Sequence, residues 1–209
     1  MRERGAKPPT EVPGVSEDED RLERAYEAER AVIRQALDLP GPWPASTTSR
    51  TQNVEVLDVD RYDGFGVVLA AIERPVLWHG PTLQASVFRS DNGWQPLCGG
   101  GGGGSNEDPL MRRRRWTDAT SVILRGGGGR CRPGPHQRAQ TVCYAKVICS
   151  PSVASVVVDR PSDRRFVDVM NGPGWVVIVW PEGAEPRVTA LGSTGEELDY
   201  LDPGLFRDR

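Results

Sequence analysis

The stretch Trp175-Val-Val-Ile-Val-Trp180 is the part of the sequence that decides the fold. Every position in it is apolar, and most of its residues are β-branched. A strand with one face in solvent alternates apolar and polar side chains, whereas a strand covered on both faces has no need to alternate. Turn-forming residues precede it at 171–174 and end it at 181–183. The stretch therefore predicts a central strand that is covered on both faces.

Further segments rich in β-branched residues lie on both sides of this stretch, separated by short turns. We expect strands at 54–59, 67–72, 76–79, 83–89, 94–98, 119–124, 141–149, 153–159, 166–170, 187–191 and 197–201. Asp63-Gly64 predicts a tight hairpin turn. The 24 Gly and 18 Pro also favour many short strands over long helices. The prediction is a mainly β fold, with antiparallel sandwich or barrel-like sheets.

One amphipathic N-terminal helix is expected before the strands. Ser16 and Glu19 have the spacing of a capping box, and the prolines from Pro40 onward end the helix. The apolar stripe of this helix consists of Leu22, Ala25, Tyr26, Ile33, Ala36 and Leu37. Glu29 interrupts the stripe, so the helix should gain its stability by docking on the sheet or on a partner. Leu22, Tyr26 and Ile33 are its candidate contact residues.

The chain divides by composition into five segments. These are a disordered tail (1–15), a helix with a Pro-rich linker (16–44), a first β region (45–98), a Gly/Arg-rich mobile segment with at most one strand (99–137) and a C-terminal β region (138–209). The glycine runs at 99–104 and 126–129 are costly to order, which favours mobile loops there. The two β regions either share one core or form two.

A metal site is not expected, although possible ligands exist. The candidate zinc ligands are Cys131, His136, Cys143 and Cys149, which lack the closely spaced pairs of a structural zinc site. Cys143 and Cys149 fall in one expected strand and would lie roughly 20 Å apart. For calcium, Asp58, Asp60 and Asp63 precede Gly64, but Tyr62 and Leu69 occupy positions that need oxygen ligands. We expect buried thiols and a hairpin turn.

No catalytic or cofactor-binding residues can be assigned. The two histidines, His79 and His136, lie in no catalytic motif, and no phosphate-binding loop is present in the sequence. A run of Arg112, Arg113, Arg114 and Arg115 followed by Trp116 could grip phosphates and stack on a base. Acidic residues flank the run, and the net charge is −3. Nucleic-acid binding is therefore disfavoured.

The segments 91–100 and 174–183, with 188–191 and 194–198 behind them, resemble small β-rich proteins of high-GC bacteria that have a Gly-rich central loop. The match covers about half of the chain, and the resemblance implies no activity. A helix leading into hairpins is also similar to the cystatin-like cone, which would imply a ligand pocket.

The sequence favours a non-enzymatic β-rich module that binds a partner protein, associates with itself or contributes structure. It has abundant Trp and Arg, which are enriched at interfaces, and no catalytic set. The alternatives are a small-ligand-binding or enzymatic cavity protein of cystatin-like type, and nucleic-acid binding through the 112–115 loop. No apolar stretch is long enough to span a membrane or to form a signal-peptide core, so a cytoplasmic location without membrane contact is expected.

Overall fold

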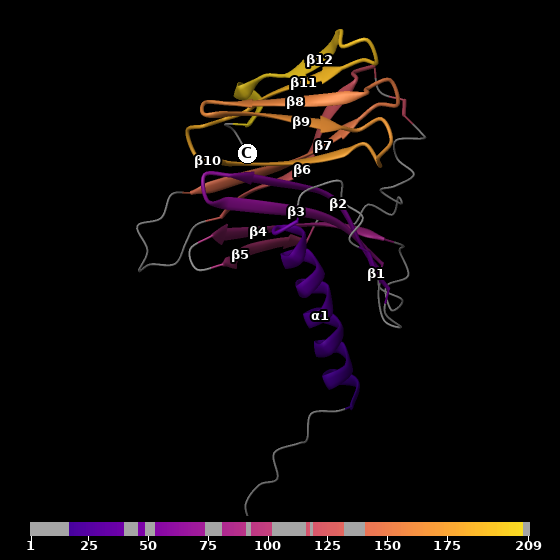
Figure 1. Ribbon diagram of the computed structural model, residues 1–209, viewed down its shortest axis with the longest axis vertical. Coiled ribbons are helices and arrows are strands. Elements are labelled where there is room, and N and C mark those ends of the chain that lie inside the picture. The colour runs from indigo at the N-terminus through magenta and orange to yellow at the C-terminus, as the bar shows by residue number, and fades with distance from the viewer. Residues whose placement is uncertain are drawn as a thin grey trace, which may run out of the picture.

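The computed structural model describes residues 17–39, 46–48, 53–73, 81–90, 93–101, 116–117, 119–131 and 141–206. Within them the protein is mainly β, with three antiparallel sheets and one N-terminal α-helix, α1 (Glu17–Ala36) (Figure 1). The predicted fold class is confirmed. The described strands form stacked open sheets and do not close into a barrel.

Sheet A follows chain order. It consists of β1 (Ser46–Thr48), β2 (Asn53–Tyr62), β3 (Phe65–Glu73), β4 (Thr82–Ser90) and β5 (Trp94–Gly101). The predicted turn joins β2 to β3, where Asp63 and Gly64 have φ values of 50° and 76°. Positive φ at both positions is what a two-residue hairpin turn of type I′ requires.

Sheets B and C are built from the C-terminal half of the chain. Sheet B has the order β10 (Trp175–Pro181), β7 (Val142–Cys149) and β6 (Val122–Cys131). Sheet C has the order β12 (Glu197–Leu201), β11 (Arg187–Leu191), β8 (Ser155–Arg160) and β9 (Asp163–Asp168), and a 3₁₀ turn, η2 (Pro203–Phe206), follows it. Along the long axis, α1 lies at one end and β12 at the other (Figure 1).

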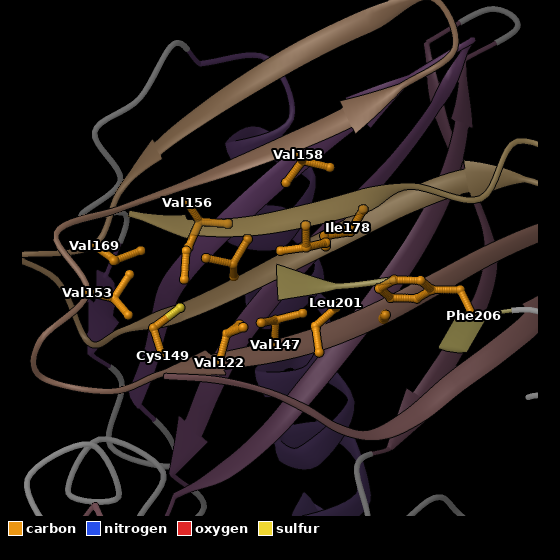
Figure 2. Packing of buried hydrophobic residues seen from close by; sticks show 14 of the residues in the cluster. Val122, Val147, Cys149, Val153, Val156, Val158, Val169, Ile178, Leu201 and Phe206 are labelled. Atoms are coloured by element: carbon orange, nitrogen blue, oxygen red, sulfur yellow. The ribbon is translucent and has the colours of Figure 1, made fainter. Parts of the chain in front are cut away.

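Sheet B is the central layer, and both of its faces are buried. In β10, alternate side chains enter two different clusters: Val176, Ile178 and Trp180 pack with sheet C, and Trp175, Val177 and Val179 pack with sheet A. Figure 2 shows the cluster between sheets B and C, where Val147 and Ile178 meet Val156 and Leu201. The prediction that the strand at 175–180 is covered on both faces is therefore confirmed.

The two β regions share a core. Val67 and Leu69 of β3 pack in one cluster with Tyr144 of β7 and Val177 of β10. The first β region thus forms one side of the cluster between sheets A and B, and the C-terminal region forms the other side. The first and last thirds of the chain fold around sheet B as one unit.

Among the described side chains of the helix, those toward its C-terminal end dock on the sheet. Ile33, Ala36 and Leu37 are buried against the outer face of sheet A, beside Val56 and Val68. The described side chains at 23–28 are exposed or half-buried, and Figure 1 shows this part of α1 projecting away from the strands. Of the two expected sources of stability for the helix, the structure shows docking on the sheet. Ser16 lies outside the described residues.

The glycine runs differ from the expectation of mobile loops. Gly99, Gly100 and Gly101 pair with residues 84–86 of β4, and the run at 126–129 lies within β6. The pairing of β6 with β7 shifts between Arg125 and Gly129, so the run forms an irregularity in the strand. Backbone groups can complete a ladder without any side chain, and this outweighed the entropy argument for these residues. The expected strand at 76–79 lies outside the described residues.

Candidate functional site

Two buried carboxylates of β2 take their direction from a β-bulge. The pairing of β2 with β3 shifts between Val56 and Asp58, so Leu57 is the extra residue of the bulge. Val56 before the bulge and Val59 after it both pack in the cluster beneath α1. The bulge therefore moves Asp58 and Asp60 onto the face of β2 that is turned toward sheet B.

These carboxylates belong to a charged cluster along the free edge of β10. The charged cluster consists of Asp58 and Asp60 from β2, Arg160 from β8 and Arg165 from β9. Because β10 pairs only with β7 among the described strands of sheet B, its outward-facing backbone groups need other partners. At Val177, the N–H donates to Asp58 Oδ2 at 2.8 Å, and the carbonyl accepts from Arg165 Nη1 at 2.9 Å.

The same arrangement repeats two residues further along β10. The Val179 N–H donates to Asp60 Oδ2 at 2.8 Å, and the Val179 carbonyl accepts from Arg160 Nη1 at 3.0 Å. Arg160 also donates to Asp163 through Nε at 2.7 Å and through Nη2 at 2.9 Å. Charged side chains thus occupy the place that a neighbouring strand would take in a continuous sheet.

The ion pairs of the charged cluster join sheets A and C directly. Arg160 Nη1 lies 2.6 Å from Asp60 Oδ2, and both side chains are almost fully buried. Arg165 bonds to Asp58 and lies 3.3 Å from Asp60 Oδ1. Burial raises the pKa of Asp58, and the Arg165 charge and the Val177 N–H oppose that rise without cancelling it. Burial alone would lower the pKa of Arg165, but Asp58 and Asp60 raise it above its ordinary value.

The groups of the charged cluster contact one another and the backbone of β10. Each of its two carboxylates accepts both a backbone N–H and a guanidinium. Asp60 accepts both through Oδ2, so its buried Oδ1 has no hydrogen bond among the described residues and lies 3.3 Å from Arg165 Nη1. A recess of about 630 Å³ opens beside it between β2, β9 and the β9–β10 turn, with Leu57 and Trp175 in its lining. Its cation Arg61 donates to the carbonyls of Ala36, Leu37 and Leu39 at the end of α1. The cationic groups of this recess are engaged within the protein.

The opposite edge of sheet B is closed in a related way. Asp199 of β12 accepts the N–H groups of Ser121 and Val122 at the start of β6, at 2.8 and 3.4 Å. Carboxylates from the two outer sheets therefore accept backbone N–H groups at both edges of the central sheet, at Val177 and Val179 of β10 and at the start of β6.

Two of the three predicted contact residues of the helix, Tyr26 and Ile33, lie at one groove. Ile33 is buried within the protein, whereas Tyr26 is 40% exposed. Tyr26, Ile33 and Phe88 line a groove of about 590 Å³ between α1 and strands β4 and β5. Glu29, which interrupts the apolar stripe, is buried beside this groove. The side chain of Leu22 lies outside what the structure describes.

The arginine run lies outside the described residues, so the structure places none of Arg112, Arg113, Arg114 and Arg115. Trp116, which follows the run, is half-buried against the cluster between sheets A and B. Its Nε1 donates to the Thr120 carbonyl at 3.1 Å. This ring contributes to the core, in contrast to the stacking platform considered for nucleic acid.

The outer face of sheet C carries exposed aromatic residues that sequence reasoning missed. The strand register places Phe166, Val157, Thr189 and Tyr200 in one row across the four strands, the aromatic row. Phe166 is 65% exposed and Tyr200 is 50% exposed, with Leu198 beside them at 37%. Arg164 lies over the Phe166 ring at 5.4 Å, and Arg187 lies over the Tyr200 ring at 4.9 Å.

This face is separate from the hydrophobic core. Among the described residues, none of the three core clusters includes a side chain of the aromatic row. The opposite face of sheet C packs on sheet B through Val156, Val158, Val188 and Ala190. Sheet C therefore has one face in the core and one face that presents two rings and two guanidinium groups to solvent.

Cys143 and Cys149 lie in β7 as predicted, are both buried, and face sheet C. Within the described part of the chain, no three His, Cys, Asp or Glu side chains gather as metal ligands. In the same part, no helix is both long enough and apolar enough to cross a membrane. Both histidines lie outside it. Comparison of the chain with family models, with curated proteins and with solved structures finds no match.

Proposed function

We propose that this protein is a non-enzymatic binding module that recognises a protein partner through the outer face of sheet C. The observation that carries the proposal is the aromatic row, in which Phe166 and Tyr200 are 65% and 50% exposed and each is covered by an arginine. Exposed apolar groups that share one face and are rimmed by polar residues are typical of protein interaction sites.

The composition of this face supports a protein as the partner. Tyr and Arg are among the residues most enriched at positions that dominate binding energies, and stacked Arg and aromatic pairs provide rigid contact area. Strands hold these side chains in place, with Val157 and Thr189 buried between the two rings. A surface of fixed shape loses little conformational entropy on binding.

The two other surfaces considered have weaker support. The charges beside the recess at Trp175 are engaged within the protein, as described for Arg61 and Asp58. The described part of α1 uses Ile33 and Leu37 to dock on sheet A. The proposal therefore places recognition at the end of the molecule that is far from the helix (Figure 1).

Site-specific photo-crosslinking tests the proposal. A benzophenone amino acid is placed at 166 or at 200 in the full chain, and at 26 as the matched aromatic position on α1. After irradiation in a native extract, we expect discrete protein adducts from 166 and 200 and none from 26. Adducts from 26 alone, or no adduct from any position, would show that the face of sheet C is not the binding surface.

A further inference from the structure

We infer that the partner of this face is a second copy of the chain, packed face to face about a two-fold axis that runs along the aromatic row. The inference rests on the proposed function, because it names the occupant of the same surface. It follows from how charges are distributed on the two sides of the row.

One side of the aromatic row is cationic. The register places Arg164, Asp159 and Arg187 side by side on β9, β8 and β11. Arg164 pairs with Asp159 at 3.1 Å, and both side chains are substantially exposed. This flank therefore holds both arginines of the outer face, although the Arg187 guanidinium extends over the Tyr200 ring toward Glu197.

The other side of the row is anionic. There the register places Asp168, Ser155, Leu191 and Glu197 side by side on β9, β8, β11 and β12. Asp168 and Glu197 are both exposed, and none of these four described residues is a cation. Glu197 lies 3.5 Å from Arg187, which reaches it from the opposite flank. Surface pairs of this kind contribute little, so they can be exchanged for contacts with another copy.

A two-fold rotation about the row brings opposite charges together. Phe166 lies midway between Arg164 and Asp168 on β9, two residues from each. Turning a second copy over about the row places Phe166 against its own mate, Arg164 against Asp168 of the second copy, and Asp168 against Arg164 of that copy. A two-fold axis along the strands would instead stack cationic flank on cationic flank. Only the first arrangement is self-complementary, as a symmetric interface must be.

The size of the face sets the expected strength. Four strands spaced about 4.8 Å apart and roughly 16 Å long cover on the order of 300 Å² in projection. This is below the size of a standard stable interface, so we expect weak, reversible dimers.

Complementary charge variants test the geometry. Alone, Arg164→Glu places its introduced carboxylate against Asp168 of its mate, and Asp168→Arg places its introduced guanidinium against Arg164. In an equimolar mixture, a dimer with one copy of each variant replaces both repulsions with attractions. The introduced carboxylate of one copy faces the introduced guanidinium of the other, and the native Asp168 of the first copy faces the native Arg164 of the second.

The readout is sedimentation velocity at a concentration where the wild type is half dimeric. We expect each variant alone to be at least tenfold weaker in association and the mixture to recover dimers. Far-UV circular dichroism checks that both variants are folded.

Three results would overturn the inference: a wild type that stays monomeric at millimolar concentration, variants that dimerise as the wild type does, or a mixture that does not recover dimers. A monomeric wild type that still gives crosslinks from 166 and 200 to another protein would overturn the second copy and leave the proposed function standing. Absence of both dimers and crosslinks would overturn both.

Discussion

Replacing Asp60 by Ala should destabilise the protein far more than replacing the exposed Asp159. Asp60 is 1% exposed, and its carboxylate accepts the Val179 N–H at 2.8 Å and Arg160 Nη1 at 2.6 Å. Its removal leaves a buried N–H without an acceptor and a buried guanidinium without one of its partners. Breaking a buried pair from one side costs about 3–5 kcal/mol. Arg160 retains its two bonds to Asp163, which favours the lower end, about 3 kcal/mol.

The matched control is Asp159→Ala, because Asp159 is also paired with an arginine but is 40% exposed. Exposed pairs contribute less than about 1 kcal/mol. If the free energy of unfolding falls by about 2 kcal/mol for each 1 M of urea, the midpoint of urea unfolding should fall by about 1.5 M for Asp60→Ala and by less than about 0.5 M for the control. The assay is tryptophan fluorescence during urea titration. Equal midpoints for the two variants would refute the role assigned to the charged cluster.

Three further changes have expected outcomes. Burial lowers the pKa of Lys146 from 10.5, so Lys146→Met should raise the free energy of unfolding at pH 7, and this gain should vanish in urea titrations above pH 10.5. Burial raises the pKa of Asp58 above 3.8 in the folded state, so protonation of this carboxyl favours folding at low pH. This contribution is lost as the pH rises from 3.8 through the raised pKa. Relative to Asp58→Asn, the free energy of unfolding of the wild type should fall over that pH range in urea titrations. Arg61→Met removes three hydrogen bonds to the end of α1 and should speed protease cleavage within the helix at least severalfold relative to Arg164→Met; equal cleavage rates would contradict the docking role of Arg61.

The fold was predictable where local patterns are strong. The unbroken apolar run at 175–180 indicated a doubly covered strand, and Asp63-Gly64 indicated a hairpin, because both signals act over a few residues. The pairing of Gly99, Gly100, Gly101 and Gly129 was not predicted, because ladder pairing of glycine depends on a neighbouring strand that is distant in sequence. Gly129, for example, lies opposite Tyr144.

The charged cluster and the aromatic row depend on register, which the sequence does not reveal. Asp58 and Asp60 were considered only as calcium ligands, because the bulge at Leu57 that turns them toward β10 has no local signature. Phe166 and Tyr200 lie far apart in sequence and share a row only through β8 and β11. The alternation of Asp58 with Val59 and Asp60 was the one available signal of paired inward carboxylates.

The most direct test of the central claim measures how exposed the aromatic row is when a partner is present. Hydroxyl-radical footprinting of the isotope-labelled chain compares a dilute purified sample with a concentrated native extract, and Tyr26 serves as the internal reference. The account predicts that oxidation of Phe166 and Tyr200 slows severalfold in the extract relative to Tyr26. Oxidation of all three rings in the same ratio under both conditions would contradict the claim that the outer face of sheet C is a binding surface.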